Sequence, residues 1–315
     1  MAVHTLAKQT FGDRLRNSWA LARKNRIGYL FVLPLVLYYA VFVIYPLIRT
    51  FSLSFYRFEF LRPDRVQYVG LGNYLKWAQD PQMLDSAWVA IKFTLWYVPL
   101  STILALVVAL VLDRVLNRFV STAYRAIFYF PVVLPAAIIF IVWQWIYDPS
   151  WGVMNHLLID ILGINWPWKG WLSDPNTALA SLIFMSVWRL MGVTMMLFLV
   201  GLSNISQELV EAARIDGANE WDLLRHITMP LLRPTLLVVL VLRLQTLGMT
   251  EEPLIMTQGG PIRSTMTYGL QAYYICFRDK NWDQGYGAAW YIILGILSSI
   301  LAYLGWKYLR GGDVE

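Results

Sequence analysis

The sequence holds few of the side chains that most enzymes and metalloproteins use for chemistry. Among its 315 residues there are one cysteine, Cys276, and three histidines, His4, His156 and His226. A single cysteine excludes an internal disulfide and a thiolate metal cluster, and the scattered histidines predict no metal site. No cluster of His, Cys and carboxylate residues suggests a catalytic centre. We therefore expect neither a metal nor an enzymatic activity in this chain.

A phosphate-binding loop of the form Gly-x-x-x-x-Gly-Lys-Ser/Thr is also missing. Such a loop cradles nucleotide phosphates with its backbone N–H groups and its lysine. The chain cannot bind ATP in that way, and we predict no cofactor in it. Energy from ATP would have to arrive through contact with another protein.

Charged residues are scarce, at 15% of the chain, whereas soluble domains carry roughly a quarter. Hydrophobic residues make up 58%. The net charge of +6 raises the question of a nucleic-acid partner. However, the basic residues lie between long apolar runs and form no patch interleaved with aromatic rings. The composition therefore indicates the lipid bilayer as a partner and no nucleic acid.

Six apolar stretches are long enough to cross a bilayer, because about 20 helical residues span a hydrocarbon core of roughly 30 Å. Isolated strands cannot satisfy their backbone groups in lipid. We predict an all-α integral membrane protein with six transmembrane helices, at 28–50, 88–112, 126–147, 178–202, 232–256 and 286–309.

The basic residues predict the orientation of these spans. Six spans put both termini on one side, and that side holds fourteen of the 26 Lys and Arg residues, against eight on the other. The positive-inside rule places both termini in the cytoplasm. We expect a cytoplasmic N-terminal tail at 1–26, too polar for a cleavable signal, a membrane domain at 27–310 and a C-terminal tail at 311–315.

The segment 203–230, between the fourth and fifth predicted spans, has the pattern of two short amphipathic helices joined by a turn. Asp216-Gly217 is the turn signal, because glycine accepts backbone angles that other residues resist. We expect the second helix to end before Pro230. The small Ala212 and Ala213 would allow close approach to another protein. An ordinary polar loop is the alternative.

The spacing of Glu211-Ala212-Ala213, Gly217, Ile227 and Pro230 resembles the EAA loop of bacterial binding-protein-dependent ABC importer permeases. The family's usual Leu before the final Pro is Met229 here, which conserves volume. Further segments resemble the carbohydrate branch, the maltose-type permeases, and the likeness covers nearly the whole chain. These segments are Tyr45-Pro46, 69–74, Arg125 with Phe130-Pro131, Trp188-Arg189 and 257–261. Phe93-Thr94 stands where the family often has Asn-Thr, which puts a polar contact there in doubt.

The resemblance implies a type I ABC importer permease fold in the cytoplasmic (inner) membrane. It implies a second permease subunit, two ATPase subunits that carry ATP and Mg, and an extracytoplasmic substrate-binding protein. The chain would import a carbohydrate, such as a sugar, oligosaccharide or polyol, by alternating access. Glu211 would anchor the loop in a cleft of the ATPase, and Gly217 would aim its first helix. The residues assigned to ATPase coupling are Glu211, Ala212, Ala213, Asp216, Gly217, Ile227 and Pro230.

Charged side chains inside spans are costly and usually face a cavity or a partner. Arg189 lies deep in the fourth span, where a structural role and a ligand contact are both open. In the fifth span we expect Pro253 to break the helix after Glu251 and Glu252. Those carboxylates could accept hydrogen bonds from sugar hydroxyls or pair with the second permease. The candidates for the substrate pathway are Trp188, Arg189, Gln245, Met249, Glu251 and Glu252.

An ion-coupled secondary transporter is the alternative function. It would use Glu251, Glu252 and Arg243 as a relay for protons or sodium. It predicts transport by the chain alone and gives no reason for the Glu-Ala-Ala hairpin.

Overall fold

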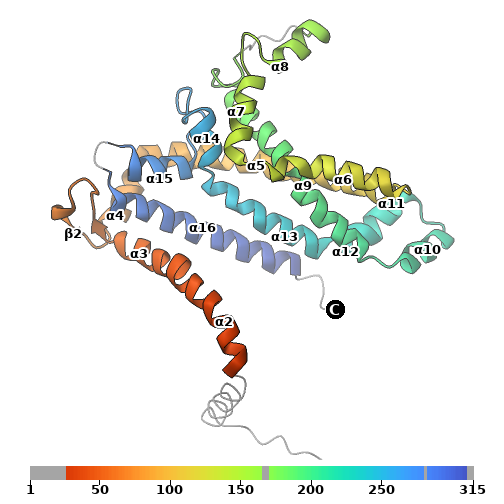
Figure 1. Cartoon of the computed structure of the whole chain (residues 1–315), viewed down its shortest axis with the longest axis horizontal. Coiled ribbons are helices and arrows are strands. Elements are labelled where there is room, and N and C mark those ends of the chain that lie inside the picture. The colour runs from red at the N-terminus through yellow and green to blue at the C-terminus, as the bar shows by residue number, and fades with distance from the viewer. Residues whose placement is uncertain (1–25, 165–169, 280–281, 311–315) are drawn as a thin grey trace, which may run out of the picture. The chain divides into compact units, whose positions relative to one another are not determined.

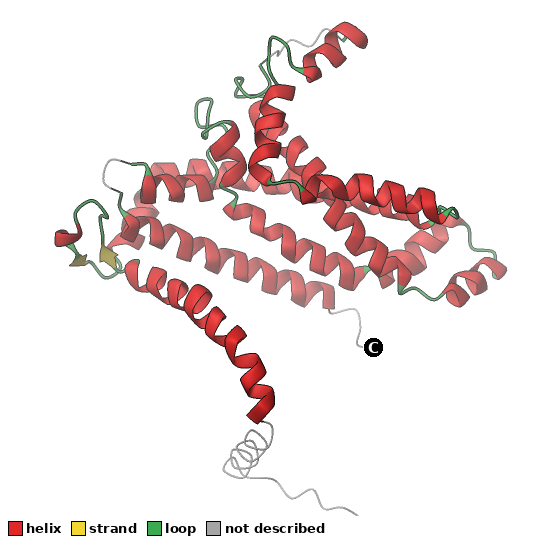
Figure 2. Ribbon diagram, in the orientation of Figure 1, coloured by secondary structure: helices red, strands yellow, loops and turns green. Residues whose placement is uncertain are grey.

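The computed structural model describes residues 26–164, 170–279 and 282–310. These residues are mostly helical, and Figure 2 shows one pair of very short strands. The chain divides into two compact units, Met1–Leu53 and Ser54–Glu315. Apart from Arg26, the tails predicted at 1–26 and 311–315 lie outside the described residues.

The first unit contains one long apolar helix, Ile27–Leu53, which matches the predicted span at 28–50. It consists of α2 (Arg26–Tyr39), the π-helical turn η1 (Ala40–Ile44) and α3 (Tyr45–Leu53). The wider turn comes just before Pro46, whose missing N–H would otherwise interrupt the hydrogen-bond pattern of the helix.

Two long helices, α5 (Pro81–Asp113) and α9 (Ala178–Ser203), pack against each other at the centre of the second unit. One stripe of α5 is buried and repeats every three or four residues, which is the spacing of a single helix face. It comprises Ser86, Ala90, Phe93, Tyr97, Ser101, Ala105, Ala109 and Leu112. Because several of these side chains are small, the two helices approach closely.

Helix α5 begins seven residues before the predicted start of the second span at 88. The Asp80 side chain caps it by accepting a hydrogen bond from the Gln82 N–H at 2.9 Å. Pro81 takes the first helical position, where its missing N–H costs nothing. The length of the apolar run therefore underestimated the length of this helix.

The third predicted span is bent by 99°. It consists of α6 (Arg118–Val133) and α7 (Ala136–Ile146), and it begins eight residues before the predicted range 126–147. Leu134 lies in the extended region, with ψ of 143°. The ring of Pro135 disfavours helical backbone at the residue before it, so the helix stops there and restarts in a new direction.

The fifth predicted span, 232–256, is broken in the structure. Helix α13 (Arg233–Arg243) continues as the 3₁₀ turn η5 (Leu244–Gly248), and a separate helix α14 (Glu251–Met256) follows. The expectation that Pro253 breaks the helix is wrong, because the break lies at Met249-Thr250 and Pro253 is in the first turn of α14. Proline is tolerated there, since first-turn N–H groups have no partner in the helix.

The remaining elements connect these helices. The last span is α16 (Gln284–Arg310), preceded by α15 (Tyr268–Phe277), and the two pack together. Strands β1 (Tyr56–Arg57) and β2 (Gln67–Tyr68) pair antiparallel around the 3₁₀ turn η2 (Pro63–Arg65) and lead into α4 (Gly72–Gln79). Helix α8 (Val153–Asn155) and the π-helical turn η3 (His156–Ile161) lie between α7 and α9.

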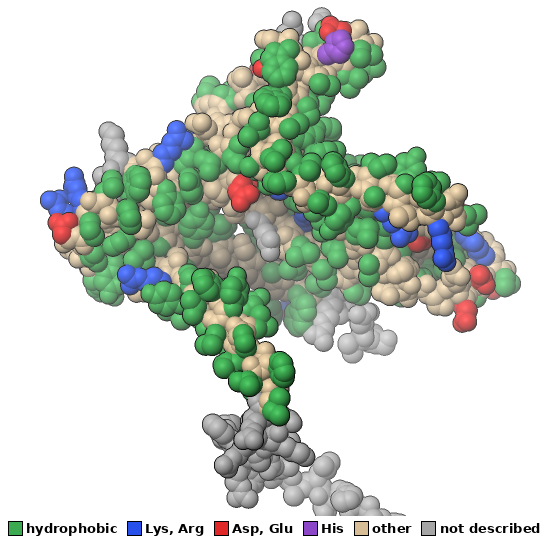
Figure 3. Space-filling model, viewed as in Figure 1, with side chains coloured by type: hydrophobic (Ala, Val, Ile, Leu, Met, Phe, Trp, Pro, Cys, Tyr) green, Lys and Arg blue, Asp and Glu red, His purple; other side chains and the backbone are tan. Residues whose placement is uncertain are grey.

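Four helices of the described chain are long and apolar enough to cross a membrane, and counting each bent pair as one span gives six. The second bent pair joins Glu220–Leu231 to Arg233–Gly248 at 63°. Hydrophobic side chains are spread over the helices on the face seen in Figure 3, and charged ones are few among them. Within the second unit, the strand pair and α4 lie at one end of the long helices, and α10 and α11 lie at the other (Figure 1).

Gly192 allows α6 and α9 to cross in contact. A Cβ atom at this position would lie 2.3 Å from the Phe128 carbonyl oxygen and 2.8 Å from the Tyr129 Cα, both backbone atoms that cannot turn aside. We expect Gly192→Ala to lower the free energy of unfolding by about 1–3 kcal/mol, as overpacking usually does. Gly295→Ala in α16 is the control, because no atom lies within 4 Å of its Cβ position. Equal thermal midpoints for the two variants in detergent would contradict this crossing.

Candidate functional site

The segment between α9 and α13 forms a helical hairpin. Its first helix is α10 (Gln207–Ile215), and its second arm comprises α11 (Glu220–Leu223), the π-helical turn η4 (Leu224–Thr228) and α12 (Met229–Leu231). Gly217 lies between the arms with φ of +90°, a conformation that residues with a Cβ rarely adopt. The Asn219 side chain caps the second arm through a capping box with Asp222. The predicted turn at Asp216-Gly217 is thus the turn of the structure.

The first arm of the hairpin has no buried residue. Glu211 and Ala212 are exposed, and Ala213 is half-buried. Ile215, at the end of the arm, is 86% exposed and Trp221 is 65% exposed. Both side chains are therefore open to contact with another molecule.

The second arm does not end before Pro230, as the sequence suggested. Pro230 lies inside α12, and the helical chain bends only after Leu231. The π-helical turn η4 comes directly before it, and the Met229 N–H bonds back to the Leu224 carbonyl. This wide turn lets a proline follow without a clash in the preceding turn. Ile227 and Pro230 are half-buried.

A cavity of about 580 Å³ lies between α5, α9, α13 and α14. Four of its lining side chains carry formal charges, namely Arg189, Arg243, Glu251 and Glu252. Two positive and two negative groups balance, so the wall has no excess of either sign.

Arg243 is buried, with 8% of its surface exposed. Its guanidinium donates to the Tyr97 hydroxyl at 2.9 Å and to the Leu190 carbonyl at 3.0 Å, and it also contacts the Thr194 hydroxyl. Arginine stays protonated in proteins, so this is a buried cation held by neutral acceptors. The contacts join α13 to both α5 and α9.

Arg189 and Glu252 form an ion pair across the same cavity. The Arg189 Nη2 lies 2.7 Å from the Glu252 Oε1, and the side chains are only 17% and 9% exposed. Glu252 is in the first turn of α14, the helix that follows the break. The ion pair therefore attaches α14 to α9. Gln144 of α7 holds the other end of α14 by donating to the Ile255 and Met256 carbonyls at 3.0 and 3.1 Å.

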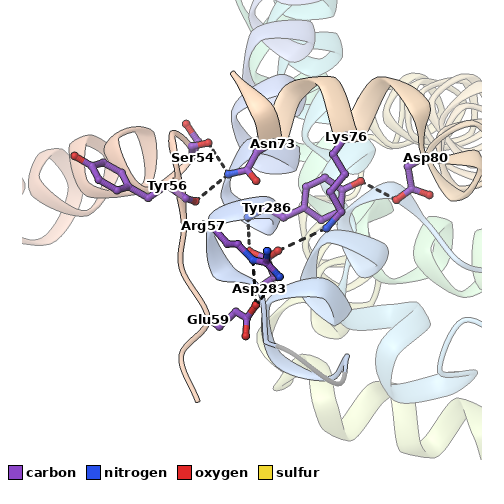
Figure 4. A network of polar contacts seen from close by, with 9 residues as sticks. All are labelled: Ser54, Tyr56, Arg57, Glu59, Asn73, Lys76, Asp80, Asp283 and Tyr286. Carbon is purple, nitrogen blue, oxygen red and sulfur yellow. Dashed lines mark hydrogen bonds and ion pairs between the residues drawn. The ribbon is translucent and has the colours of Figure 1, made fainter. Parts of the chain in front are cut away.

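A network of polar contacts lies at the opposite end of the second unit from the hairpin (Figure 4). The Asn73 amide is buried and donates to the carbonyls of Ser54 and Tyr56 at 2.8 and 2.9 Å. The Lys76 ammonium lies 3.6 Å from the Asp283 carboxylate and 3.7 Å from the centre of the Tyr286 ring. These contacts tie the segment after the first helix to the start of α16.

Residues 101–310 match the model of a protein family described as "binding-protein-dependent transport system inner membrane component". The chain belongs to this family. The permease is 36% identical over 287 residues to the trehalose/maltose transport system permease protein of Thermococcus litoralis, covering 90% of this chain and 94% of that one. It is 32% identical over 292 residues to the arabinooligosaccharides transport system permease protein of Bacillus subtilis, covering 90% and 88%.

The fold of the permease is that of a type I ABC importer. It matches a chain in the crystal structure of a bacterial alginate ABC transporter, in complex with its alginate pentasaccharide-bound periplasmic protein, with a TM-score of 0.78. Sequence identity to that chain is 20%, and 91% of this chain and 95% of that one are covered. The predicted all-α type I importer fold and the predicted multi-pass inner-membrane location are confirmed, and the cytoplasmic placement of both termini stays a prediction. As a permease subunit, the chain is a transport component and not an enzyme.

The structure brings some of the predicted pathway residues of the permease together and separates others. Arg189, Met249, Glu251 and Glu252 all line the cavity. Trp188 lies outside that lining, and its ring centre is 5.4 Å from that of Trp143 in α7. Gln245 is in η5, and its side chain lies outside the described part of the chain.

Sequence reasoning missed the side chains that hold Arg243. Tyr97 and Thr194 lie in the second and fourth spans, among mainly apolar neighbours. A buried arginine needs hydrogen-bond acceptors on adjacent helices. The polar residues in those two spans are few, and they were the signal that could have identified the partners of Arg243. The sequence put a polar contact at Phe93-Thr94 in doubt. A polar contact is present there, because the Thr94 hydroxyl lies 3.4 Å from the Thr246 hydroxyl.

Proposed function

We propose that the permease carries a neutral carbohydrate, such as a sugar, an oligosaccharide or a polyol, through the cavity between α5, α9, α13 and α14. The observation that carries this proposal is the balance of two cationic and two anionic side chains around the cavity. A wall without net charge suits a ligand without charge, and Glu251 is an exposed carboxylate that can accept hydrogen bonds from hydroxyls. Relatives of the permease transport trehalose, maltose and arabinooligosaccharides by their names.

The hairpin is the proposed ATPase-coupling loop. The exposed first arm and its turn carry Glu211, Ala212, Ala213, Asp216 and Gly217 at the end of the second unit where α5 and α9 also end. We propose that this surface docks in a separate ATPase subunit, which binds ATP and Mg. Two such subunits, a second permease and an extracytoplasmic substrate-binding protein complete the importer. ATP-driven closure of the ATPases then moves the hairpins, and the cavity alternates between the two sides of the membrane.

The ion-coupled alternative fits the contacts less well. Its relay needs Glu252 and Arg243 free to exchange partners, yet Glu252 is paired with Arg189 and Arg243 is held by the hydroxyls of Tyr97 and Thr194. Breaking either set would leave a buried charge without a partner, which is costly.

Co-purification followed by reconstitution tests the proposal. The tagged permease is expressed with the ATPase, second permease and binding protein encoded beside it, and the purified complex is placed in liposomes. We expect the ATPase to co-purify and sugar uptake to require ATP, the binding protein and no ion gradient. Uptake by the permease alone, abolished by an ionophore, would establish the ion-coupled alternative. A thermal-shift screen of the binding protein against neutral and anionic sugars tests the substrate class.

A further inference from the structure

The hairpin is joined to the membrane helices by one carboxylate that bridges two arginines. The Glu220 Oε2 lies 2.6 Å from the Arg114 Nη2, and the Glu220 Oε1 lies 2.9 Å from the Arg214 Nη2. Each oxygen of the carboxylate therefore serves a different guanidinium. We call these three residues the Glu220 bridge.

The three residues come from three different elements. Arg114 is the C-cap residue directly after α5, Arg214 is in the last turn of α10, and Glu220 begins α11. The bridge thus connects the end of the second membrane span to the second arm of the hairpin, and the second arm to the first. It crosses the turn at Gly217, so it also fixes the angle between the two arms.

Few other contacts join the first arm to the spans. A cavity of about 800 Å³ separates the hairpin from the ends of α5 and α9, and the three bridge residues are all in its lining. The first arm buries no residue of its own. Besides the chain link from α9 to α10, the Glu220 bridge is therefore a side-chain route by which a push on that arm reaches α5.

Helix α5 leads from the bridge to the central cavity. It is an unbroken helix of 33 residues, and Phe93 and Tyr97 on it line that cavity. Tyr97 lies sixteen residues before the end of the helix at Asp113, a distance of about 24 Å at 1.5 Å per residue. Because Tyr97 bonds to Arg243, a shift of α5 changes the contact that holds the fifth span.

The bridge is not a device for stability. Its side chains are 54–62% exposed, and ion pairs at such exposed positions contribute little to folding. The ion pairs matter for the position of the hairpin, because a carboxylate bound by two arginines opposes movement of the hairpin along α5 in both directions. Without Glu220, neither guanidinium keeps its carboxylate partner, and the hairpin loses its ion pair to the end of α5.

We propose that Glu220 and Arg114 are positioning residues that transmit the movement of the hairpin to α5 and so couple ATP hydrolysis to transport. The inference rests on the proposed function, since it assumes that an ATPase moves the hairpin. It adds a route and two residues that the Glu-Ala-Ala spacing does not contain.

The ratio of sugar transported to ATP hydrolysed tests this role in the reconstituted importer. We expect Glu220→Gln and Arg114→Gln to lower that ratio by about 2- to 30-fold, the range in which coupling positions usually act. Co-purification of the ATPase and its hydrolysis rate should stay at the wild-type level, a combination that simple misfolding would not give. Arg114→Lys keeps a cation at the bridge and should restore most of the ratio.

Arg118→Gln is the matched control. Arg118 is an exposed arginine four residues after Arg114, at the start of α6, and it forms no ion pair within the described ranges. An unchanged ratio in Glu220→Gln, or an equal loss in Arg118→Gln, would overturn the inference while leaving the proposed function intact. Failure of the wild-type complex to bind an ATPase would instead overturn the proposed function.

Discussion

Replacing Glu252 by methionine should destabilise the permease more than replacing Glu252 and Arg189 together. The single change leaves the Arg189 guanidinium largely buried without its carboxylate partner 2.7 Å away. Removing one member of a buried pair usually costs about 3–5 kcal/mol, whereas replacing both by apolar residues of similar size is often neutral or stabilising. The measurement is the free energy of unfolding in detergent for Glu252→Met and for the double variant with Arg189→Met.

Glu251→Met provides the control for this comparison. Glu251 is the neighbouring carboxylate in the same helical turn, but it is exposed and has no ion pair in the part of the chain that the structure describes. Its replacement should change the stability by no more than about 0.5 kcal/mol, as is usual for surface positions. If the double variant were as unstable as Glu252→Met, the pair would not be the source of the loss.

Replacing Gly217 by valine should abolish most of the ATP-driven uptake while leaving the membrane helices folded. The φ of +90° at Gly217 is strained for any residue with a Cβ, and most of all for a β-branched one. A strain of about 1–3 kcal/mol moves the first arm away from its docking angle and weakens ATPase binding by about 10- to 100-fold. The readouts are the amount of ATPase that co-purifies and the rate of sugar uptake.

Gly70→Val is the matched control for the hairpin variant. Gly70 has φ of +55° and, like Gly217, has no atom within 4 Å of its Cβ position. It lies in the segment between β2 and α4, at the end of the second unit away from the hairpin. The backbone strain is of the same kind, so ATPase binding should stay at the wild-type level in this variant. Equal loss of ATPase in both variants would point to general destabilisation.

The number of spans and the hairpin could be predicted from the sequence because both depend on local patterns. Long apolar runs produce α5, α9 and α16, and the glycine after Asp216 produces the turn. The bend between α6 and α7 was not predicted, although it has a local cause, since Pro135 restricts the backbone of Leu134 before it. The early start of α5 at the Asp80-Pro81 cap was a further local signal that hydropathy alone overlooks.

The break in the fifth span could not be predicted, because its cause lies in distant parts of the chain. The Thr267 hydroxyl donates to the Met249 carbonyl at 2.6 Å, and α15 comes so near that a Cβ on Gly269 would be 2.3 Å from the Gly248 carbonyl oxygen. The tertiary contact thus competes for backbone groups of the helix. The local signal used to predict a break was Pro253, which lies four residues after Met249, where the break occurs.

The pairing inside the cavity had the same limit. Arg189 and Glu252 are 63 residues apart, and a single sequence does not show which carboxylate on which helix meets a buried arginine. A pair with a second permease was an equally good expectation from the sequence. The structure places both partners in one chain and leaves Glu251 as the carboxylate free of that pair.

The close approach of Gly285 to the first strand has a consequence for how the transporter moves. A Cβ on Gly285 would lie 2.0 Å from the Tyr56 carbonyl oxygen, and the Phe60 N–H bonds to the Trp282 carbonyl at 3.2 Å. The segment of the strand pair therefore contacts the beginning of α16 directly, although the two are more than 200 residues apart in the sequence. We expect alternating access to keep these contacts and to move the broken segment α13, η5 and α14, which lines the cavity.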